Sequence, residues 1–280
     1  MAKIIFSLLL FFPSLLFAQA QVFPTHLTLT EEAPSSYLNL RNSSSENQSY
    51  KIELMFFKMQ KDGSMKREPS APNALTDVIK FSPKTISLTP NEKQVVRVMA
   101  TSFDSLTDGE YYIHIHFLPS VNKSEDKESE VKKSSSFSLT AKIAVAVPIV
   151  VRKGTGTLTG EVKNFKATYD KQKDLNVNLS LTNNSKFFLY GDLDLIAVTD
   201  KGEVALDKVI GLSSYLPERT FTKKISAQDL AEKIKDDKIK KIKVTYKSNA
   251  ESAAAFDLAS ETEISTASPV KAKKKSSKRQ

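Results

Sequence analysis

The chain has 280 residues and a formal net charge of +9, and it contains no cysteine and only eight glycines. The absence of cysteine excludes a disulfide framework and a cysteine nucleophile, so a chain of this length must fold around hydrophobic cores. The sequence has no glycine-rich phosphate loop and no G-x-S-x-G nucleophile elbow. We therefore expect a protein that is not an enzyme and that carries no cofactor.

The first twenty residues have the pattern of a secretory signal peptide. Lys3 is followed by an apolar run from Ile4 to Phe17 and by the small-residue motif "AQA" at 18–20. We expect cleavage there and export, with mature protein from Gln21. An uncleaved anchor is the alternative, and no other segment is predicted to cross a membrane.

The chain from Gln21 to Lys153 is predicted to be a sandwich of antiparallel strands. Short runs with apolar residues at every second position alternate with clusters of Pro, Gly, Asn or Asp, without intervening helices. The predicted strands are "HLTLT", "SYLNLRN", "YKIELMFFKM", "VIKFSPKTISLT", "KQVVRVMA" and "YYIHIHFLP". The stretch "KDGSMKREPSAPN" between two of them is interpreted as a turn cluster.

A long apolar strand is predicted from Phe137 to Val151, directly after a leader of charge and serine. It is too short for a spanning helix, and its β-branched residues favour a strand. Read with period two, one face is strongly apolar. That face carries Phe137, Leu139, Ala141, Ile143, Val145 and Val147.

A Gly/Thr-rich linker after Arg152 separates a second predicted sandwich, from 154 to 265. Its predicted strands are "EVKNFKATYD", "LNVNLSLTNN", "YGDLDLIAVT", "EVALDKVIG" and "KIKVTYKS". One short helix is expected in "SAQDLAEKIKD", with Ser226 as its N-cap. The fold class is therefore all-β, as two tandem immunoglobulin-like antiparallel sandwiches.

The basic excess lies in the C-terminal tail, 266–280. Without the six basic residues of that tail and Lys3, 34 basic residues face 32 acidic ones. We expect a disordered tail, with contact to an anionic surface or polymer as the alternative. No nucleic-acid partner is expected, because the folded part is nearly neutral.

His114 and His116 lie two residues apart in a predicted strand, so they share a face. Such H-x-H pairs occur in zinc sites, with His26 or a carboxylate as a third ligand. The alternative is that both are polar residues on the solvent face of a strand whose other face is apolar. The spacing alone is weak evidence for a metal.

Four stretches resemble the periplasmic chaperones of pilus and fimbria assembly, which have two immunoglobulin-like domains. These stretches are "FSPKTISLTPNEKQVVRVMA", "DGEYYIHIHF", the charged leader with "FSLTAKIAVAVPIVVR", and "NNSKFFLYGDLDL". The second is similar to a strand of that family with a tyrosine corner. The likeness spans most of Val22 to Tyr246 and is closer to a divergent branch of the family.

The resemblance implies a chaperone that lends a strand to pilus or fimbrial subunits and delivers them to an outer-membrane usher. Chaperone–pilin donor-strand complementation is a known form of β-augmentation. The apolar face from Phe137 to Val147 has the period that such a strand needs. The alternative is that Ile143, Val145 and Val147 fill this domain's own core, and we expect the earlier residues to be donated and the later ones to be partly core.

The resemblance also implies a cation pair that anchors the subunit's terminal carboxylate. At the corresponding positions this sequence has His26 and Pro148, so neither is a permanent cation. We consider Arg97 as the substitute, where an arginine needs an acidic partner or a route to solvent, and Arg152 or Lys142 next. The alternative for Arg97 is a solvent-facing charge on an alternating strand. A structural or adhesive immunoglobulin-like envelope module without client transfer remains the alternative function, and a metal-dependent enzyme would require tightly bound zinc.

Overall fold

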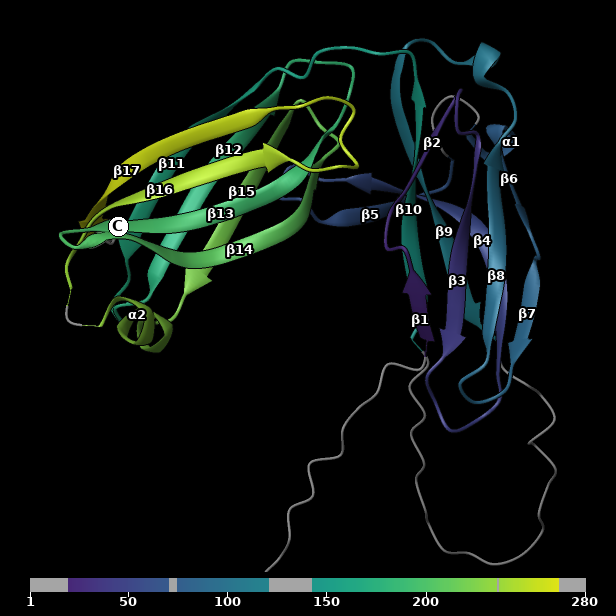
Figure 1. Cartoon of the computed structure of the whole chain (residues 1–280), viewed down its shortest axis with the longest axis horizontal. Helices are drawn as coiled ribbons and strands as arrows, with labels where there is room; N and C mark the ends of the chain where they lie inside the picture. The colour runs from purple at the N-terminus through teal and green to yellow at the C-terminus, as the bar shows by residue number, and fades with distance from the viewer. Residues whose placement is uncertain (1–19, 71–74, 121–142, 236, 267–280) are drawn as a thin grey trace, which may run out of the picture.

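The computed structural model describes residues 20–70, 75–120, 143–235 and 237–266. The chain forms two β-sandwiches in tandem, each with its own hydrophobic core (Figure 1). The predicted all-β class with two sandwiches is confirmed.

The first sandwich packs a four-stranded sheet against a six-stranded one. The four-stranded sheet has the order β1 (Ala20–Phe23), β3 (Ser35–Asn42), β8 (Lys93–Ala100) and β6 (Ile79–Ser82). The other has the order β2 (Leu27–Thr30), β10 (Val145–Lys153), β9 (Gly109–Pro119), β4 (Gln48–Met59) and β5 (Met65–Glu68), with β7 (Thr85–Leu88) paired to β4. Two short helical turns, α1 (Leu75–Val78) and η2 (Phe103–Ser105), complete it.

Strict alternation in β9 builds the centre of the first core. Ile113, Ile115 and Phe117 are fully buried and point into the sandwich. The residues that alternate with them, Tyr112, His114 and His116, therefore point away from this core, on the outer face of the six-stranded sheet.

The second sandwich is a folded ribbon of seven strands. Its order is β14 (Gly202–Ser214), β13 (Leu189–Thr199), β16 (Ile239–Ser248), β17 (Asp257–Thr266), β11 (Gly160–Tyr169), β12 (Leu175–Asn183) and β15 (Glu218–Ile225). β17 joins the two layers, because it pairs with β16 along its first part and with β11 at its end.

The predicted helix is present as α2 (Ala227–Ile234) at the far end of the second sandwich (Figure 1). The Ser226 hydroxyl accepts a hydrogen bond from the Asp229 N–H at 3.0 Å, as an N-cap should. Leu230 and Ile234, four residues apart, are buried against the sandwich.

The same asparagine-based turn closes one strand in each sandwich. The Asn42 side chain accepts from the Ser44 N–H at 3.0 Å and donates to the Glu46 carbonyl at 2.7 Å. Asn183 makes the matching bonds to Ser185 at 3.0 Å and to the Phe187 carbonyl at 2.7 Å. Both amides are buried, so these asparagines have a structural role in the turns that follow β3 and β12.

Several details of the predicted strands are wrong. The cluster "KDGSMKREPSAPN" contains β5 rather than only a turn, and β1, β15 and β17 were not predicted. Two strand pairs are parallel, β2 with β10 and β11 with β17, in sandwiches predicted to be antiparallel. β10 begins at Val145, and residues 137–142 of the predicted long strand lie outside the described residues.

Candidate functional site

The first half of β10 lies at an edge of its sheet. One side of β10 pairs with β9 from Val145 to Lys153. The other side pairs with β2 only from Ile149 to Arg152. Along Val145–Pro148, no strand of the described ranges pairs with this second side. Pro148 fits the position, because proline lacks an N–H and is tolerated at edges.

The apolar face of β10 changes from buried to exposed toward its N-terminal end. Val147 is 2% exposed and belongs to the core of the first sandwich, and Val145 packs against that core. Ile143, just before the strand, is 62% exposed. Phe137, Leu139 and Ala141 lie outside the described residues. Val147 is therefore a core residue, as expected for the later residues of this face, and donation by the earlier residues stays a prediction.

A buried ion pair links the end of β10 to the second sandwich. Arg152 Nε donates to Glu110 Oε1 at 2.6 Å, with side chains 17% and 3% exposed. The other Glu110 oxygen accepts from the Phe188 N–H at 2.6 Å, and Arg152 Nη2 donates to the Glu251 carbonyl at 2.9 Å. Burial raises the pKa of Glu110, whereas the Phe188 amide and Arg152 favour its carboxylate form.

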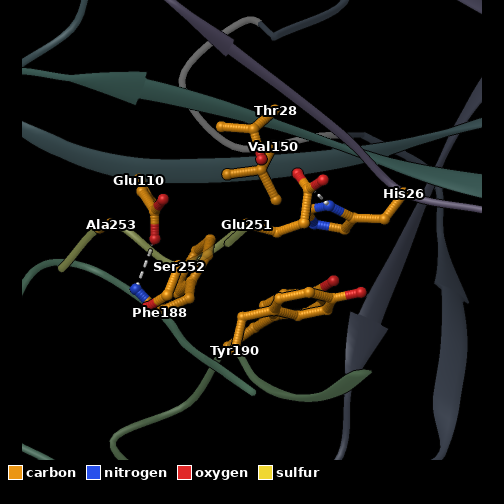
Figure 2. A pocket seen from close by; sticks show the side chains of 10 residues that line it. His26, Thr28, Glu110, Val150, Phe188, Tyr190, Glu251, Ser252 and Ala253 are labelled. Atoms are coloured by element: carbon orange, nitrogen blue, oxygen red, sulfur yellow. Dashed lines mark hydrogen bonds and ion pairs between the residues drawn. The ribbon is translucent and has the colours of Figure 1, made fainter. Parts of the chain in front are cut away.

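His26 is enclosed at the same interdomain contact (Figure 2). Its ring stacks on Tyr190 at a centroid distance of 4.4 Å, and Nδ1 lies 3.7 Å from Glu251 Oε2. Burial lowers the pKa of His26, although the Glu251 carboxylate opposes this shift. The family likeness assigns a cation to this position. In this chain the position holds His26, and Tyr190 and Glu251 of the second sandwich lie beside it.

These contacts change the predicted set of carboxylate anchors. Arg152 already holds the Glu110 carboxylate, and His26 faces Glu251. Lys142 lies outside the described residues. Arg152 and His26 were predicted as groups for a foreign carboxylate, yet both contact carboxylates of this chain.

Arg97 lies on the outer face of the four-stranded sheet and is exposed. It sits between Tyr37 of β3 and Ser82 of β6 in the register. Arg97 is therefore a solvent-facing charge in the free chain, which was the alternative, and its role as a carboxylate anchor stays a prediction. The alternation of "KQVVRVM" correctly places Val96 and Val98 inward, and Arg97 is the outward residue between them.

Replacing Arg97 with alanine is expected to change the free energy of unfolding by less than about 0.5 kcal/mol, as for most exposed positions. The measurement is urea unfolding of the purified variant beside the wild type. A loss on the order of 2 kcal/mol or more would mean that the guanidinium has a buried partner.

His114 and His116 are buried, so their predicted place on a solvent face is wrong. They are 6% and 7% exposed, although they point away from the first core. Phe57 of β4 covers them: its ring stacks on His116 at 4.8 Å and meets His114 edge-on at 5.5 Å. No group of three or more potential metal ligands occurs among the residues that the structure describes.

We expect acid to destabilise the first sandwich through His114. Burial, with a smaller effect of His116, lowers the pKa of His114 to about 4. The unfolded chain takes up this proton below about pH 6.5 and the folded chain only below about 4, so stability falls across that window. The loss amounts to about 3 kcal/mol at most, from 1.36 kcal/mol per pKa unit. Urea unfolding of wild type and His114→Phe at pH 7 and pH 5 measures it; an equal loss in both proteins would contradict this assignment.

Tyr111 confirms one feature that the family likeness implied. Its hydroxyl donates to the Thr107 carbonyl at 2.9 Å, four residues upstream, which is the geometry of a tyrosine corner. The next residue, Tyr112, points the other way and stacks on Tyr215 of the second sandwich at 4.2 Å.

The sequence interpretation missed Glu110, Tyr190, Tyr215 and Glu251. A signal for Glu110 was available, since period two puts it on the same face of β9 as Tyr112. Glu110 also lies directly opposite Arg152 in the register. The other three residues come from the second sandwich, and no local pattern marks them.

Comparisons with known proteins give weak similarities. No protein-family model and no curated protein matches the chain. Among solved structures, the class 5 fimbriae chaperone CfaA is similar at 14% identity and a TM-score of 0.46, covering 86% of this chain and 98% of its own. A chain of the CsuC–CsuE chaperone–tip adhesion subunit complex of Acinetobacter baumannii is similar at 13% identity and a TM-score of 0.45, with 90% and 100% covered.

The chaperone CupB2 of Pseudomonas aeruginosa is also similar, at 13% identity and a TM-score of 0.44, covering 88% of this chain and all of its own. These scores are below 0.5, and the two-sandwich fold is established by this chain's own strand pairing. Within the described ranges, no helix is long and apolar enough to span a bilayer.

Proposed function

We propose that this protein is a periplasmic chaperone of pilus or fimbrial subunits that lends them a strand. The segment from Phe137 to Pro148 pairs along its free side with a strand of the client. Its alternate apolar side chains fill the groove that an incomplete subunit exposes. The reaction involves no covalent chemistry, so the proposed chaperone is not an enzyme.

The observation that carries the proposal is that, among the residues the structure describes, no strand pairs with the second side of β10 along Val145–Pro148. A free strand edge presents a row of N–H and C=O groups and is a template for pairing with another chain. A long apolar edge without such a partner is an aggregation hazard, which natural proteins avoid. A client strand would remove this hazard and bury the exposed Ile143.

The side chains that follow the same period divide into two groups. Val145 and Val147 pack in the chaperone's own core and hold the strand in place. Ile143 and, in the sequence before it, Phe137, Leu139 and Ala141 are proposed to enter the client. This division fits β-augmentation, in which main-chain hydrogen bonds give affinity and alternate side chains give specificity.

We also propose that a signal peptide at 1–20 directs export and is cleaved, and that the protein delivers its clients to an outer-membrane usher. The proposed domains are 21–153 and 154–265. The solved structures named above are fimbrial chaperones, which is the class proposed here, but the proposal itself rests on β10.

Co-purification from the periplasm tests the proposed function. We expect the chain to bring down a small secreted subunit that lacks one strand of its sandwich and is degraded when the chaperone is absent. Retention of the chain on a cell-surface ligand, with no bound subunit, would favour the adhesive envelope module instead. Neighbouring genes for an usher barrel and small secreted subunits would be independent support.

A further inference from the structure

The turn between β4 and β5 reaches across to the second sandwich. The Lys61 carbonyl accepts two hydrogen bonds from Thr220 at the start of β15, from its N–H at 2.7 Å and its hydroxyl at 3.0 Å. The Lys61 ammonium lies 3.1 Å from Glu218 Oε1. Lys61 and Thr220 are 159 positions apart in the chain, so this is a long-range contact.

The next residues of the turn lie against the Arg219 guanidinium. Gly63 has a φ of +83°, and a Cβ placed there would be only 2.3 Å from Nη2 of Arg219. The backbone conformation therefore favours glycine at this position, and a larger side chain would also have to displace the Arg219 guanidinium. Arg219 is half-buried, and burial lowers its pKa, whereas the Asp62 carboxylate in the turn opposes the shift.

Hydrogen bonds within the turn hold its tip in one shape. The Gln60 N–H donates to the Ser64 carbonyl at 2.7 Å, and the Gly63 N–H donates to the Gln60 carbonyl at 2.9 Å. The Asp62 carboxylate accepts from the Ser64 N–H at 2.9 Å and from its hydroxyl at 2.6 Å. The Lys61 carbonyl is thus aimed at β15 by the turn itself, and little ordering is left for the contact to impose.

The two sandwiches are also joined by the contact that includes Glu110, Arg152 and the Phe188 amide. That contact comes from β9 and β10, next to the connection between the sandwiches, whereas the β4–β5 turn is a separate hairpin of the first sandwich. The stacks of His26 on Tyr190 and of Tyr112 on Tyr215 also join the two sandwiches. The β4–β5 turn adds a polar contact from a separate hairpin, which further restricts hinge rotation between them.

We propose that the β4–β5 turn is an interdomain clamp that, through Lys61 and Gly63, fixes the angle between the two sandwiches. Interfaces between domains of one chain usually permit relative motion. The clamp instead presets the position of the free edge of β10 relative to the second sandwich. This inference concerns the conformation of the chain alone and holds whether or not the chain binds a subunit.

The absence of natural cysteine makes the angle measurable with introduced spin labels. We suggest cysteines at the exposed Thr85 of β7 and Glu232 of α2, one on each sandwich, and pulsed-EPR distances between them. Thr220→Pro removes the N–H and the hydroxyl that reach Lys61, and proline is tolerated on edge strands such as β15. Thr222→Pro is the matched control, because it places proline on the same edge two residues along.

We expect a narrow distance distribution for the wild type and for Thr222→Pro, and a broadened, shifted one for Thr220→Pro. Gly63→Val disturbs the same contact from the first sandwich and should also broaden the distance distribution. The clamp can therefore still be tested if Thr220→Pro fails to fold. Unchanged distributions for folded Thr220→Pro or Gly63→Val would overturn the clamp. Equal broadening in Thr222→Pro would do so as well, since the effect would then not depend on Lys61.

Discussion

If the proposed function holds, replacing Ile143 with aspartate is expected to abolish capture of a pilus subunit while the protein stays folded. Ile143 is 62% exposed and precedes the first strand residue that packs against the core of the first sandwich. A carboxylate forced into the client's apolar groove would cost on the order of several kcal/mol. Leu139→Asp should have the same effect. The measurement is protection of the co-expressed subunit from degradation, with circular dichroism to check the fold.

Ala144→Asp is the matched control for this prediction. Ala144 is the next residue, is also exposed, and has the opposite parity along the strand. Its carboxylate should stay in solvent and leave capture nearly unchanged. If Ile143→Asp and Leu139→Asp both protect the subunit as well as the wild type does, the donated strand has been misassigned.

Replacing Arg152 with methionine is expected to destabilise the protein by about 3–5 kcal/mol, the range for breaking a buried ion pair from one side. The Glu110 carboxylate would remain only 3% exposed and would lose its cation. The contact from Arg152 to the Glu251 carbonyl would also be lost, so the two sandwiches should separate more easily. Chemical unfolding followed separately in each sandwich measures the effect.

Two comparisons separate a buried unpaired charge from the simple loss of an ion pair. The double variant Glu110→Gln, Arg152→Met should recover part of the stability, because no charge stays buried and the amide oxygen can still accept from Phe188. Lys241→Met removes an exposed pair with Glu261, whose atoms lie 2.7 Å apart, and should cost less than about 1 kcal/mol. A similar small cost for Arg152→Met would contradict the structural weight given to Glu110 and Arg152.

Alternation within a strand was predictable from the sequence where one face of that strand is core. It correctly assigned Ile113, Ile115 and Phe117 to the interior of the first sandwich. The alternation does not tell what lies over the other face of the strand, and the prediction for that face of β9 was wrong. His114 and His116 look like solvent-facing residues by period alone, yet Phe57 from another strand covers them.

The missed strand β17 is polar for a physical reason. β17 reads "DLASETEIST", which has few apolar residues, and its Glu261 and Glu263 lie beside strand β16. Lys241 and Glu261 form a cross-strand ion pair that replaces apolar alternation as the stabilising contact on the solvent face. Such pairs are recognised only once the register is known.

The interdomain site was least predictable, because its partners are far apart in the chain. The Glu110 carboxylate and the Phe188 amide are separated by 78 positions, and Arg152 and the Glu251 carbonyl by 99. The sequence analysis named His26 because the family likeness implies a cation at its position. The neighbours of His26 in the structure are Tyr190 and Glu251. Long-range contacts of this kind leave no local periodicity.

Hydrogen exchange of this protein, with and without a subunit that co-purifies with it, tests the proposed lent strand most directly. The account predicts that subunit binding slows exchange of backbone amides between Phe137 and Val147, because the client strand pairs with that edge. Amides of β8, in the opposite sheet, should exchange at the same rate in both states. Unchanged exchange from Phe137 to Val147 in a complex that is demonstrably intact would contradict the account, since the subunit would then be held by another surface.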